Sequence, residues 1–215
     1  MAVTVISFAT YLTRDESPWR SDDYNALKFI QAIKGEPINK WAWVPVGGIS
    51  RRLDQDNADD ALEWFGELAA DYLNGKKLVR PVFLVPIPNS PCTAANGKVP
   101  RTARLAKAIA DRMQNVTVLD CLRWKKVMPS ARKGGSRDPQ VLYENMTIKG
   151  DVSKGRVVLV DDVSTTGAHL QAAAAKIVNE GGKCVLAICA GRTVLCPEEE
   201  PFSVLEQKLQ DFVPR

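Results

Sequence analysis

The fold is decided by one stretch of this chain, Arg156-Val-Val-Leu-Val-Asp-Asp-Val-Ser-Thr-Thr-Gly-Ala-His169. Its residues 157–160 form an unbroken apolar run, which is typical of a parallel strand covered on both faces. Asp161 and Asp162 follow this run, at the carboxyl end of the predicted strand. Because open α/β sheets bind their ligands at that edge, the two carboxylates are the first candidates for a binding site.

The residues after the two acids predict an anion site. Ser164, Thr165 and Thr166 supply three hydroxyls, and Gly167 gives the backbone the freedom to turn its N–H groups toward a bound group. A helix predicted from residue 168 adds the positive end of its dipole. Serine and threonine also cap helices without any ligand, but a simple cap does not require adjacent carboxylates. The residue types allow the acids to hold ribose hydroxyls and Mg²⁺ while the loop holds a phosphate.

Composition sets limits on the class of protein. The chain has 215 residues, 45% of them hydrophobic, and a net charge of +4, which favours anionic ligands without marking a nucleic-acid-binding protein. The sequence has no basic leader and no apolar run of about 18 residues, so we expect a cytoplasmic protein without membrane contact. Five cysteines without a Cys-x-x-Cys motif are expected to be reduced. Of these, Cys184 and Cys189 are expected on opposite faces of one strand.

Hydrophobic periodicity predicts an α/β fold with a twisted, mainly parallel sheet flanked by helices. The expected strands of this core are 82–85, 116–119, 157–160 and 184–190, and the expected helices are 101–113 and 168–180. We predict three regions: a mostly helical cap or hood at 1–80, the α/β core at 81–195, and a tail at 196–215 with a short helix over 204–212. The cap is expected to hold a strand near 3–12 and helices near 22–34 and 58–74, the latter capped by Asn57.

The run Val160-Asp-Asp-Val-Ser-Thr-Thr-Gly-Ala168 resembles the phosphoribosyl pyrophosphate (PRPP) motif of the type I phosphoribosyltransferases at every position. The resemblance implies PRPP binding with Mg²⁺ and transfer of ribose 5-phosphate to a nitrogenous acceptor, with release of pyrophosphate. It implies that Asp161 and Asp162 bind ribose and the metal, and that residues 164–167 bind the 5′-phosphate. Purine-salvage members have an aspartate where this chain has Thr165, which argues against that subclass.

Two further segments match the family's pyrophosphate elements by their order in the chain. Asn89 and Ser90 lie in a proline-rich loop after a predicted strand, where the family binds pyrophosphate. A basic segment between residues 123 and 137 contains no acid and matches the family's flexible loop. Its candidate pyrophosphate ligands are Lys125, Lys126, Arg132, Lys133 and Arg137. A solvated loop or a phosphate-backbone patch for DNA or RNA are the alternatives for this segment.

Within the family, residues 22–193 are most similar to the competence-associated ComF type. The shared segments are Ala26-Leu-Lys-Phe29, Val85-Pro-Ile-Pro88, Leu105-Ala106, Met128-Pro129 and Ala190-Gly-Arg192. The chain departs from this type in lacking its cysteine-rich zinc element and in having Gly97-Lys-Val-Pro-Arg101 near the place of its Arg-Gly-Phe-Asn-Gln. His169 stands where the type has Thr or Ser, and we hypothesise that it touches the 5′-phosphate; the alternative is an exposed surface histidine.

Two other classes of function stay open. One is a PRPP- or nucleotide-binding module without turnover, acting as a sensor or as a DNA-uptake-associated regulatory partner. The other is nucleic-acid binding through the basic segment. Under any of these functions, including the transferase, Trp41, Trp43 and Trp124 are candidates for stacking a base, with packing in the core or cap as the alternative. A homodimer is plausible from the resemblance, and the acceptor has no recognisable motif.

Overall fold

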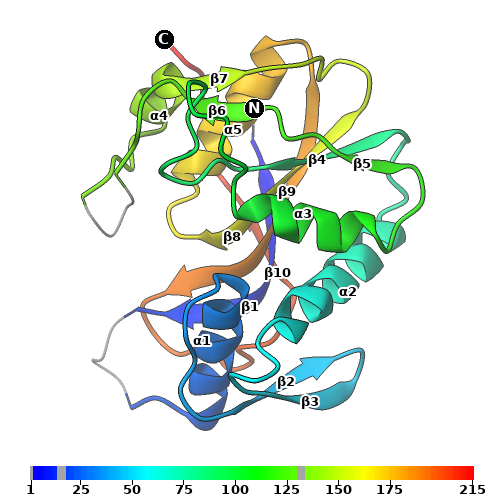
Figure 1. The fold of residues 1–215 in the computed structure, drawn as a ribbon, viewed down its shortest axis with the longest axis vertical. Helices are drawn as coiled ribbons and strands as arrows, with labels where there is room; N and C mark the ends of the chain where they lie inside the picture. The colour runs from blue at the N-terminus through cyan, green and yellow to red at the C-terminus, as the bar shows by residue number, and fades with distance from the viewer. Residues whose placement is uncertain (1, 14–17, 130–133) are drawn as a thin grey trace.

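A computed structural model gives the fold of residues 2–13, 18–129 and 134–215. Its centre is a six-stranded sheet in the order β10-β1-β9-β8-β4-β5 (Figure 1). Every neighbouring pair is parallel except β10 with β1. The strands are β1 (Thr4–Leu12), β4 (Val82–Pro86), β5 (Val116–Val118), β8 (Arg156–Ser164), β9 (Lys183–Val194) and β10 (Leu205–Lys208). The predicted fold class, a mainly parallel sheet flanked by helices, is confirmed.

Helices cover both faces of this sheet. One face packs against α1 (Ser21–Ile33), α2 (Asp60–Gly75) and α3 (Thr102–Ala110). The other face packs against α5 (Ala168–Asn179), α4 (Pro139–Asn145) and a small sheet formed by β6 (Leu122–Trp124) and β7 (Met146–Ile148). Along β8, Val158 and Val160 belong to the first core, whereas Val157 and Leu159 belong to the second. This alternation explains why the central strand is apolar without interruption.

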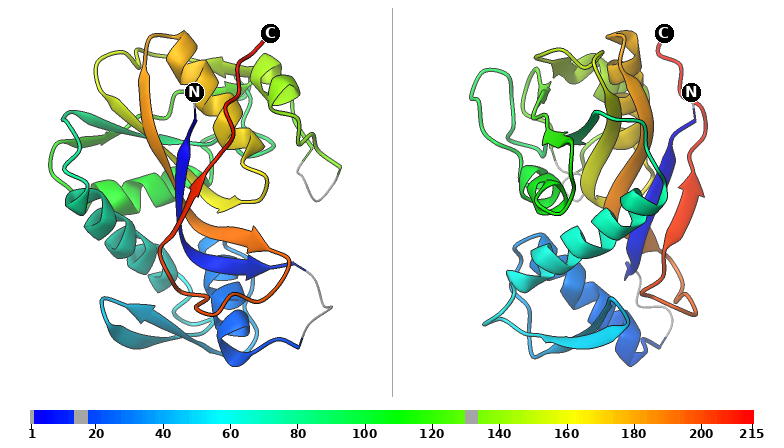
Figure 2. Two further views of the ribbon diagram at one scale, coloured as in Figure 1. Left: turned by 180° about the vertical axis from the view of Figure 1, so that it is seen from behind. Right: turned by 90° about the vertical axis from the view of Figure 1, so that its right-hand side faces the viewer.

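The amino-terminal region differs from the predicted cap in its first strand. β1 lies inside the central sheet, between β9 and β10, so only the part after it forms a separate layer (Figures 1 and 2). That part consists of α1, α2 and a hairpin of β2 (Ala42–Val46) with β3 (Ile49–Leu53). Asn57 does not cap α2 with its side chain, because its Oδ1 accepts a hydrogen bond from the Asp54 N–H at 2.7 Å instead.

The prediction of a short helix in the tail is wrong. Residues 205–208 form β10, which pairs antiparallel with β1 at the edge of the sheet. Leu205, Gln207 and Leu209 are more buried than Glu206 and Lys208 between them. This period of two fits a strand, and pairing with β1 overrides the helix propensity of Leu, Glu, Gln and Lys.

The expectation for the two cysteines of β9 is also wrong. Cys184 and Cys189 both belong to the core on the α5 side of the sheet. The cause is a β-bulge, since Val157 pairs with Cys184 but Val158 pairs with Leu186. One additional residue in β9 shifts the alternation by one position, which returns Cys189 to the face of Cys184.

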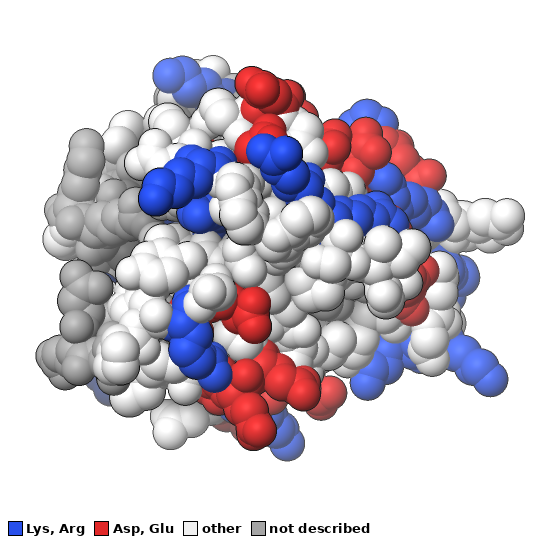
Figure 3. All heavy atoms as spheres, turned by 90° about the horizontal axis from the view of Figure 1, so that it is seen from below, with Lys and Arg blue, Asp and Glu red and all other residues white. Residues whose placement is uncertain are grey.

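The end of the molecule formed by α1 and the β2–β3 hairpin exposes several aromatic and aliphatic side chains. Among them are Tyr24, Trp41, Trp43 and Ile49. Figure 3 views the molecule from this end and shows uncharged surface between groups of charged side chains. Trp124, by contrast, is buried, so it is not available to stack a base from solution. In the described part of the chain, no helix has both the length and the apolar character that a bilayer span needs.

Candidate functional site

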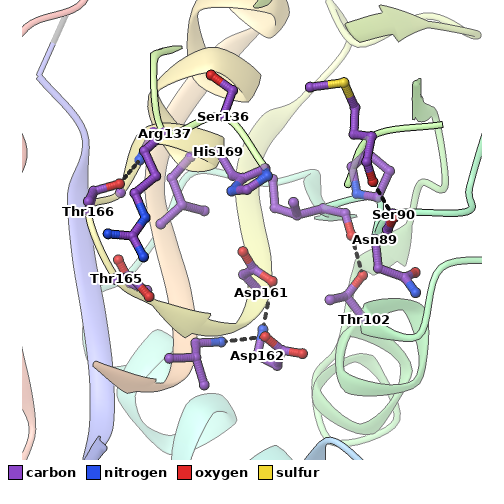
Figure 4. Close-up of a pocket in the computed structure, with 18 of the residues that line it drawn as sticks. Asn89, Ser90, Thr102, Ser136, Arg137, Asp161, Asp162, Thr165, Thr166 and His169 are labelled. Carbon is purple, nitrogen blue, oxygen red and sulfur yellow. Dashed lines mark hydrogen bonds between the residues drawn. The ribbon is translucent and has the colours of Figure 1, made fainter. Parts of the chain in front are cut away.

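The acidic pair lies within β8, which continues through both aspartates to Ser164. Asp161 accepts a hydrogen bond on Oδ1 from the Asp162 N–H at 2.8 Å, and Asp162 accepts one from the Val163 N–H at 2.7 Å. The second carboxylate also forms an ion pair with the guanidinium of Arg101 at the start of α3. The two carboxylates therefore share one site but have different partners (Figure 4).

Burial and charge make the two acids unequal. Although part of Asp161 stays open to the cavity, most of its carboxyl group is enclosed by protein. Burial raises the pKa of Asp161 well above its usual value, and the neighbouring charge of Asp162 raises it further. The hydrogen bond from the Asp162 N–H and the charges of Arg101 and Lys34 act in the opposite direction. A cation bound at this carboxylate would favour its ionised form.

The hydroxyl-rich loop connects β8 to α5. Thr165 and Thr166 are exposed, and the Ala168 N–H lies 3.4 Å from Thr166 Oγ1. Gly167 has φ +78°, a left-handed conformation that favours glycine, and α5 begins at the next residue. Ser164 is buried, and its hydroxyl has no hydrogen-bond partner among the described residues. The loop thus presents two exposed threonine side chains and the amino end of a helix at the carboxyl edge of the sheet.

The proline-rich loop forms the opposite wall. Asn89 accepts hydrogen bonds on Oδ1 from the Arg101 N–H at 3.0 Å and from Cys92 Sγ at 3.1 Å. The Ser90 hydroxyl donates to the Met128 carbonyl, and the Thr102 hydroxyl donates to the Ile87 carbonyl at 2.6 Å. These bonds fix the loop against the start of α3. Asn89 and Ser90 both line the cavity from this side.

His169 packs against Trp124 at the back of the site. The two ring centroids are 5.7 Å apart and the rings meet edge to face at 70°. Trp124 is held by its Nε1–H, which donates to the Pro88 carbonyl at 3.0 Å. Burial lowers the pKa of His169, and the charge of Asp162 opposes this only in part. Burial therefore favours the neutral form of the imidazole, and the side chain is half-buried rather than an exposed surface histidine.

These elements enclose one cavity of ≈ 190 Å³. Its polar lining residues are Asn89, Ser90, Arg101, Thr102, Ser136, Arg137, Asp161, Asp162, Ser164, Thr165, Thr166 and His169, together with Gly167. Figure 4 shows how β8, the loop to α5 and the start of α3 bring these side chains together. Of the predicted basic segment, only Arg137 is described as lining the cavity. Lys125 and Lys126 are exposed and do not line it, and Arg132 and Lys133 lie outside the described residues.

The donor set can be compared with the needs of Mg²⁺. The described residues contain no group of three or more His, Cys, Asp or Glu side chains that could hold a metal ion on their own. Asp161 and Asp162 are the two carboxylates that reach the cavity. Mg²⁺ is commonly held by one or two carboxylates, with substrate phosphates and water completing its shell. The pair therefore fits a magnesium ion that arrives with a phosphorylated ligand.

Sequence reasoning missed Arg101, Thr102 and Ser136 as lining residues, and it considered Trp124 only for stacking a base. Arg101 left a signal in the sequence. Arg101 and Arg104 fall in the first turn of a predicted helix that has no acidic residue there. Since a cation opposes the dipole at that end, such an arginine needs a partner elsewhere, and Asp162 provides it.

No family model and no curated protein match this chain. Several solved structures do match it. A purine phosphoribosyltransferase from Pyrococcus horikoshii is 21% identical with a TM-score of 0.36, and the match covers 65% of this chain and 78% of that protein. An adenine phosphoribosyltransferase from Thermoanaerobacter pseudethanolicus is 16% identical with a TM-score of 0.43, and the match covers 76% of this chain and 99% of that protein. The adenine phosphoribosyl transferase from Trypanosoma brucei, solved with AMP, pyrophosphate and ribose-5-phosphate, is 13% identical with a TM-score of 0.42. This match covers 89% of this chain and 87% of that protein. These are distant likenesses of fold, and they assign no activity to this chain.

Proposed function

We propose that this protein binds PRPP with Mg²⁺ and transfers ribose 5-phosphate to a nitrogenous acceptor, with release of pyrophosphate. One observation carries the proposal: the acidic pair and the hydroxyl-rich loop open into the same cavity as the side chains of Arg101 and Arg137. A sugar carrying phosphate groups at both ends needs this combination. The carboxylates suit its hydroxyls, the helix end suits one phosphate, and the arginines suit the other.

The proposed roles follow the position of each residue. Asp161 and Asp162 hold the ribose hydroxyls, while residues 164–167 and His169 hold the 5′-phosphate. Asn89 and Ser90 face the pyrophosphate, with Arg137 as the principal cation of the basic segment. Lys125, Lys126, Arg132 and Lys133 remain predictions for the same role. Of these roles, that of Ser90 requires its hydroxyl to leave the Met128 carbonyl.

Magnesium would be held on the carboxylate side of the cavity, by Asp161 and Asp162. When bound, it would neutralise the leaving diphosphate. The protein's own contribution is to position the sugar and to keep cationic side chains beside the departing group. Arg101 already pairs with Asp162, so on ligand binding its guanidinium must share its N–H donors between this carboxylate and the incoming anion.

The test begins with binding. PRPP with Mg²⁺ is titrated calorimetrically into the wild-type protein and into the Asp161→Asn/Asp162→Asn double variant. Asp71→Asn, an exposed position on α2, serves as the matched control. We expect binding by the wild type and the control and none by the double variant. Pyrophosphate release is then measured against a panel of nitrogenous acceptors. A folded wild type that does not bind PRPP would contradict the proposal.

A second candidate is binding of PRPP or a nucleotide without turnover, as in a regulatory module of the ComF type. One observation favours it: position 165 is a threonine, whose hydroxyl cannot act as a general base near pH 7. PRPP binding without pyrophosphate release from any acceptor would select this candidate. The predicted homodimer and nucleic-acid binding stay predictions, for which light scattering and salt-dependent DNA titration are the direct measurements.

A further inference from the structure

The segment after β10 runs from the edge of the sheet past α5 to α4. β10 pairs with β1, and the Leu209 N–H then donates to the Val3 carbonyl at 2.9 Å. Beyond this bond the chain passes α5 toward α4, as the red segment of Figure 2 shows. We call residues 209–212 the strap. Nothing in the sequence motif or in the proposed chemistry accounts for its course.

The strap contacts the phosphate loop at its most constrained residue. Leu209 is 5% exposed, and a Cβ placed on Gly167 would lie 2.6 Å from both of its methyl carbons. The leucine side chain therefore packs directly against the α-carbon of the glycine that precedes α5. Four residues further along the helix, Gln171 Nε2 donates to the Gln210 carbonyl at 2.8 Å. The strap thus supports both the turn and the first part of α5 from outside the cavity.

The strap also contacts the helix next to the opposite wall. The rings of Phe212 and Tyr143 meet edge to face with centroids 6.1 Å apart. Tyr143 belongs to α4, which begins two residues after Arg137. Lys176 of α5 lies over the same tyrosine ring, with Nζ 3.8 Å from its centroid. One short segment thereby touches the loop that carries the hydroxyls and the helix that follows the cavity-lining arginine.

We propose that Leu209 is a positioning residue for the anion loop. It fills the space against Gly167, so the left-handed turn cannot relax outward, and the loop keeps its conformation beside the cavity. The nature of the anion rests on the proposed function, but the restraint on the loop does not. A loop held in its binding conformation loses less conformational freedom when the ligand arrives, and its affinity rises accordingly.

The test compares Leu209→Ala with two matched variants. Leu209→Met keeps most of the volume, and Leu205→Ala shortens a leucine of β10 on the same segment, before the strap begins. Ribose 5-phosphate and pyrophosphate are titrated separately. Leu209→Ala should weaken ribose 5-phosphate binding about 10-fold and pyrophosphate binding less than about 2-fold, because only the first ligand depends on this loop. Leu209→Met and Leu205→Ala should bind both like the wild type.

A second measurement needs no ligand. Amide hydrogen exchange should become faster over residues 164–170 in Leu209→Ala, while the exchange of β4 and α3 stays unchanged. An equal loss of affinity for both ligands, or unchanged exchange of the loop, would overturn the role of Leu209. If the wild type binds neither ligand but amide exchange over residues 164–170 is still faster in Leu209→Ala, the proposed function fails and the inference about Leu209 stands. If Leu209→Ala does not fold, Leu209→Val repeats both measurements with a smaller loss of volume.

Discussion

The two walls of the cavity are built in different ways. One wall is a single run of ten consecutive residues, 161–170, from the end of β8 through the loop into α5. The other wall draws on four separate parts of the chain: residues 87–90, residues 101–102, Trp124 with Met128 and Pro129, and residues 136–137. The first wall depends on local backbone conformation, which neighbouring residues determine. The second depends on packing between distant parts of the chain, so a motif search does not find it.

The largest expected effect concerns the contiguous wall. Gly167 and Gly181 lie at opposite ends of α5, with φ +78° and +79°. Alanine at Gly181 meets only Ser153 Cβ at 3.9 Å and should cost about 1 kcal/mol of backbone strain. Alanine at Gly167 also overlaps Leu209, so we expect a loss of about 2–4 kcal/mol in the free energy of unfolding. Urea unfolding measures both.

Ligand binding separates the same two variants. Gly167→Ala should weaken PRPP binding about 100-fold because the loop N–H groups are displaced, whereas Gly181→Ala should bind normally. Equal destabilisation and equal affinity of the two variants would show that the contiguous wall needs only its backbone conformation and no support from the strap.

The next prediction addresses the composite wall. Arg101→Gln removes the cation that pairs with Asp162, and we expect PRPP affinity to fall about 10-fold, since the ligand is a polyanion. Arg104→Gln is the control, because Arg104 lies in the same turn of α3 but is exposed and does not line the cavity. Calorimetry at two salt concentrations measures the effect. Equal losses in the two variants would mean that only the overall charge of α3 matters.

The two adjacent acids should respond to substitution in opposite directions. The raised pKa of Asp161 means that the folded state binds this proton more tightly than the unfolded chain. The contribution of Asp161 to stability is therefore greatest below the usual carboxyl pKa and is lost as pH rises through the raised value. Asp161→Asn should remove this penalty and stabilise the ligand-free protein by about 1 kcal/mol at pH 7, with little change near pH 4.

Asp162→Asn is the matched control for that experiment. It removes the partner of Arg101 and should not stabilise the protein at either pH. Thermal unfolding of both variants across pH 4–8 gives the comparison. If Asp161→Asn is no more stable than the wild type at pH 7, the carboxyl group is better solvated than the structure indicates.

Most of the fold could be predicted from the sequence, because hydrophobic periodicity and local turn residues carry it. The order of β4, α3, β5, β8, α5 and β9 follows from apolar runs and glycine stops, whereas β6, α4 and β7, between residues 122 and 148, were not predicted. The exceptions depend on long-range pairing. The tail has the composition of a helix but becomes β10 because β1 offers an edge, and the bulge opposite Val157 reverses the expected face of Cys189. Neither feature has a local signal.

The same division applies to the site. The site residues predicted between positions 161 and 169 came from residue types in a strand–loop–helix order and from the resemblance to the PRPP motif. They all line the cavity: Asp161, Asp162, Ser164, Thr165, Thr166, Gly167 and His169. The basic segment was selected for its charge, but charge does not determine which side chains face the cavity. Arg137 lines the cavity, whereas Lys125 and Lys126 do not. Trp124 was considered for stacking, yet it is buried and supports His169. Charge and aromatic character indicate what a side chain can do, whereas tertiary packing decides where it is.

The smallest expected effect lies where the two walls meet. His169 belongs to the contiguous run, but its environment is set by Trp124 from the composite wall, and burial there lowers its pKa. A bound 5′-phosphate would raise that pKa, so affinity should increase as pH falls between the two values. From pH 7.5 to 6 we expect about a 3-fold greater gain in PRPP affinity for the wild type than for His169→Gln. The ligand's own titration affects both proteins equally and cancels in the ratio. Parallel affinity curves would mean that the imidazole does not face the phosphate, and His169 would then serve the packing of Trp124 rather than the ligand.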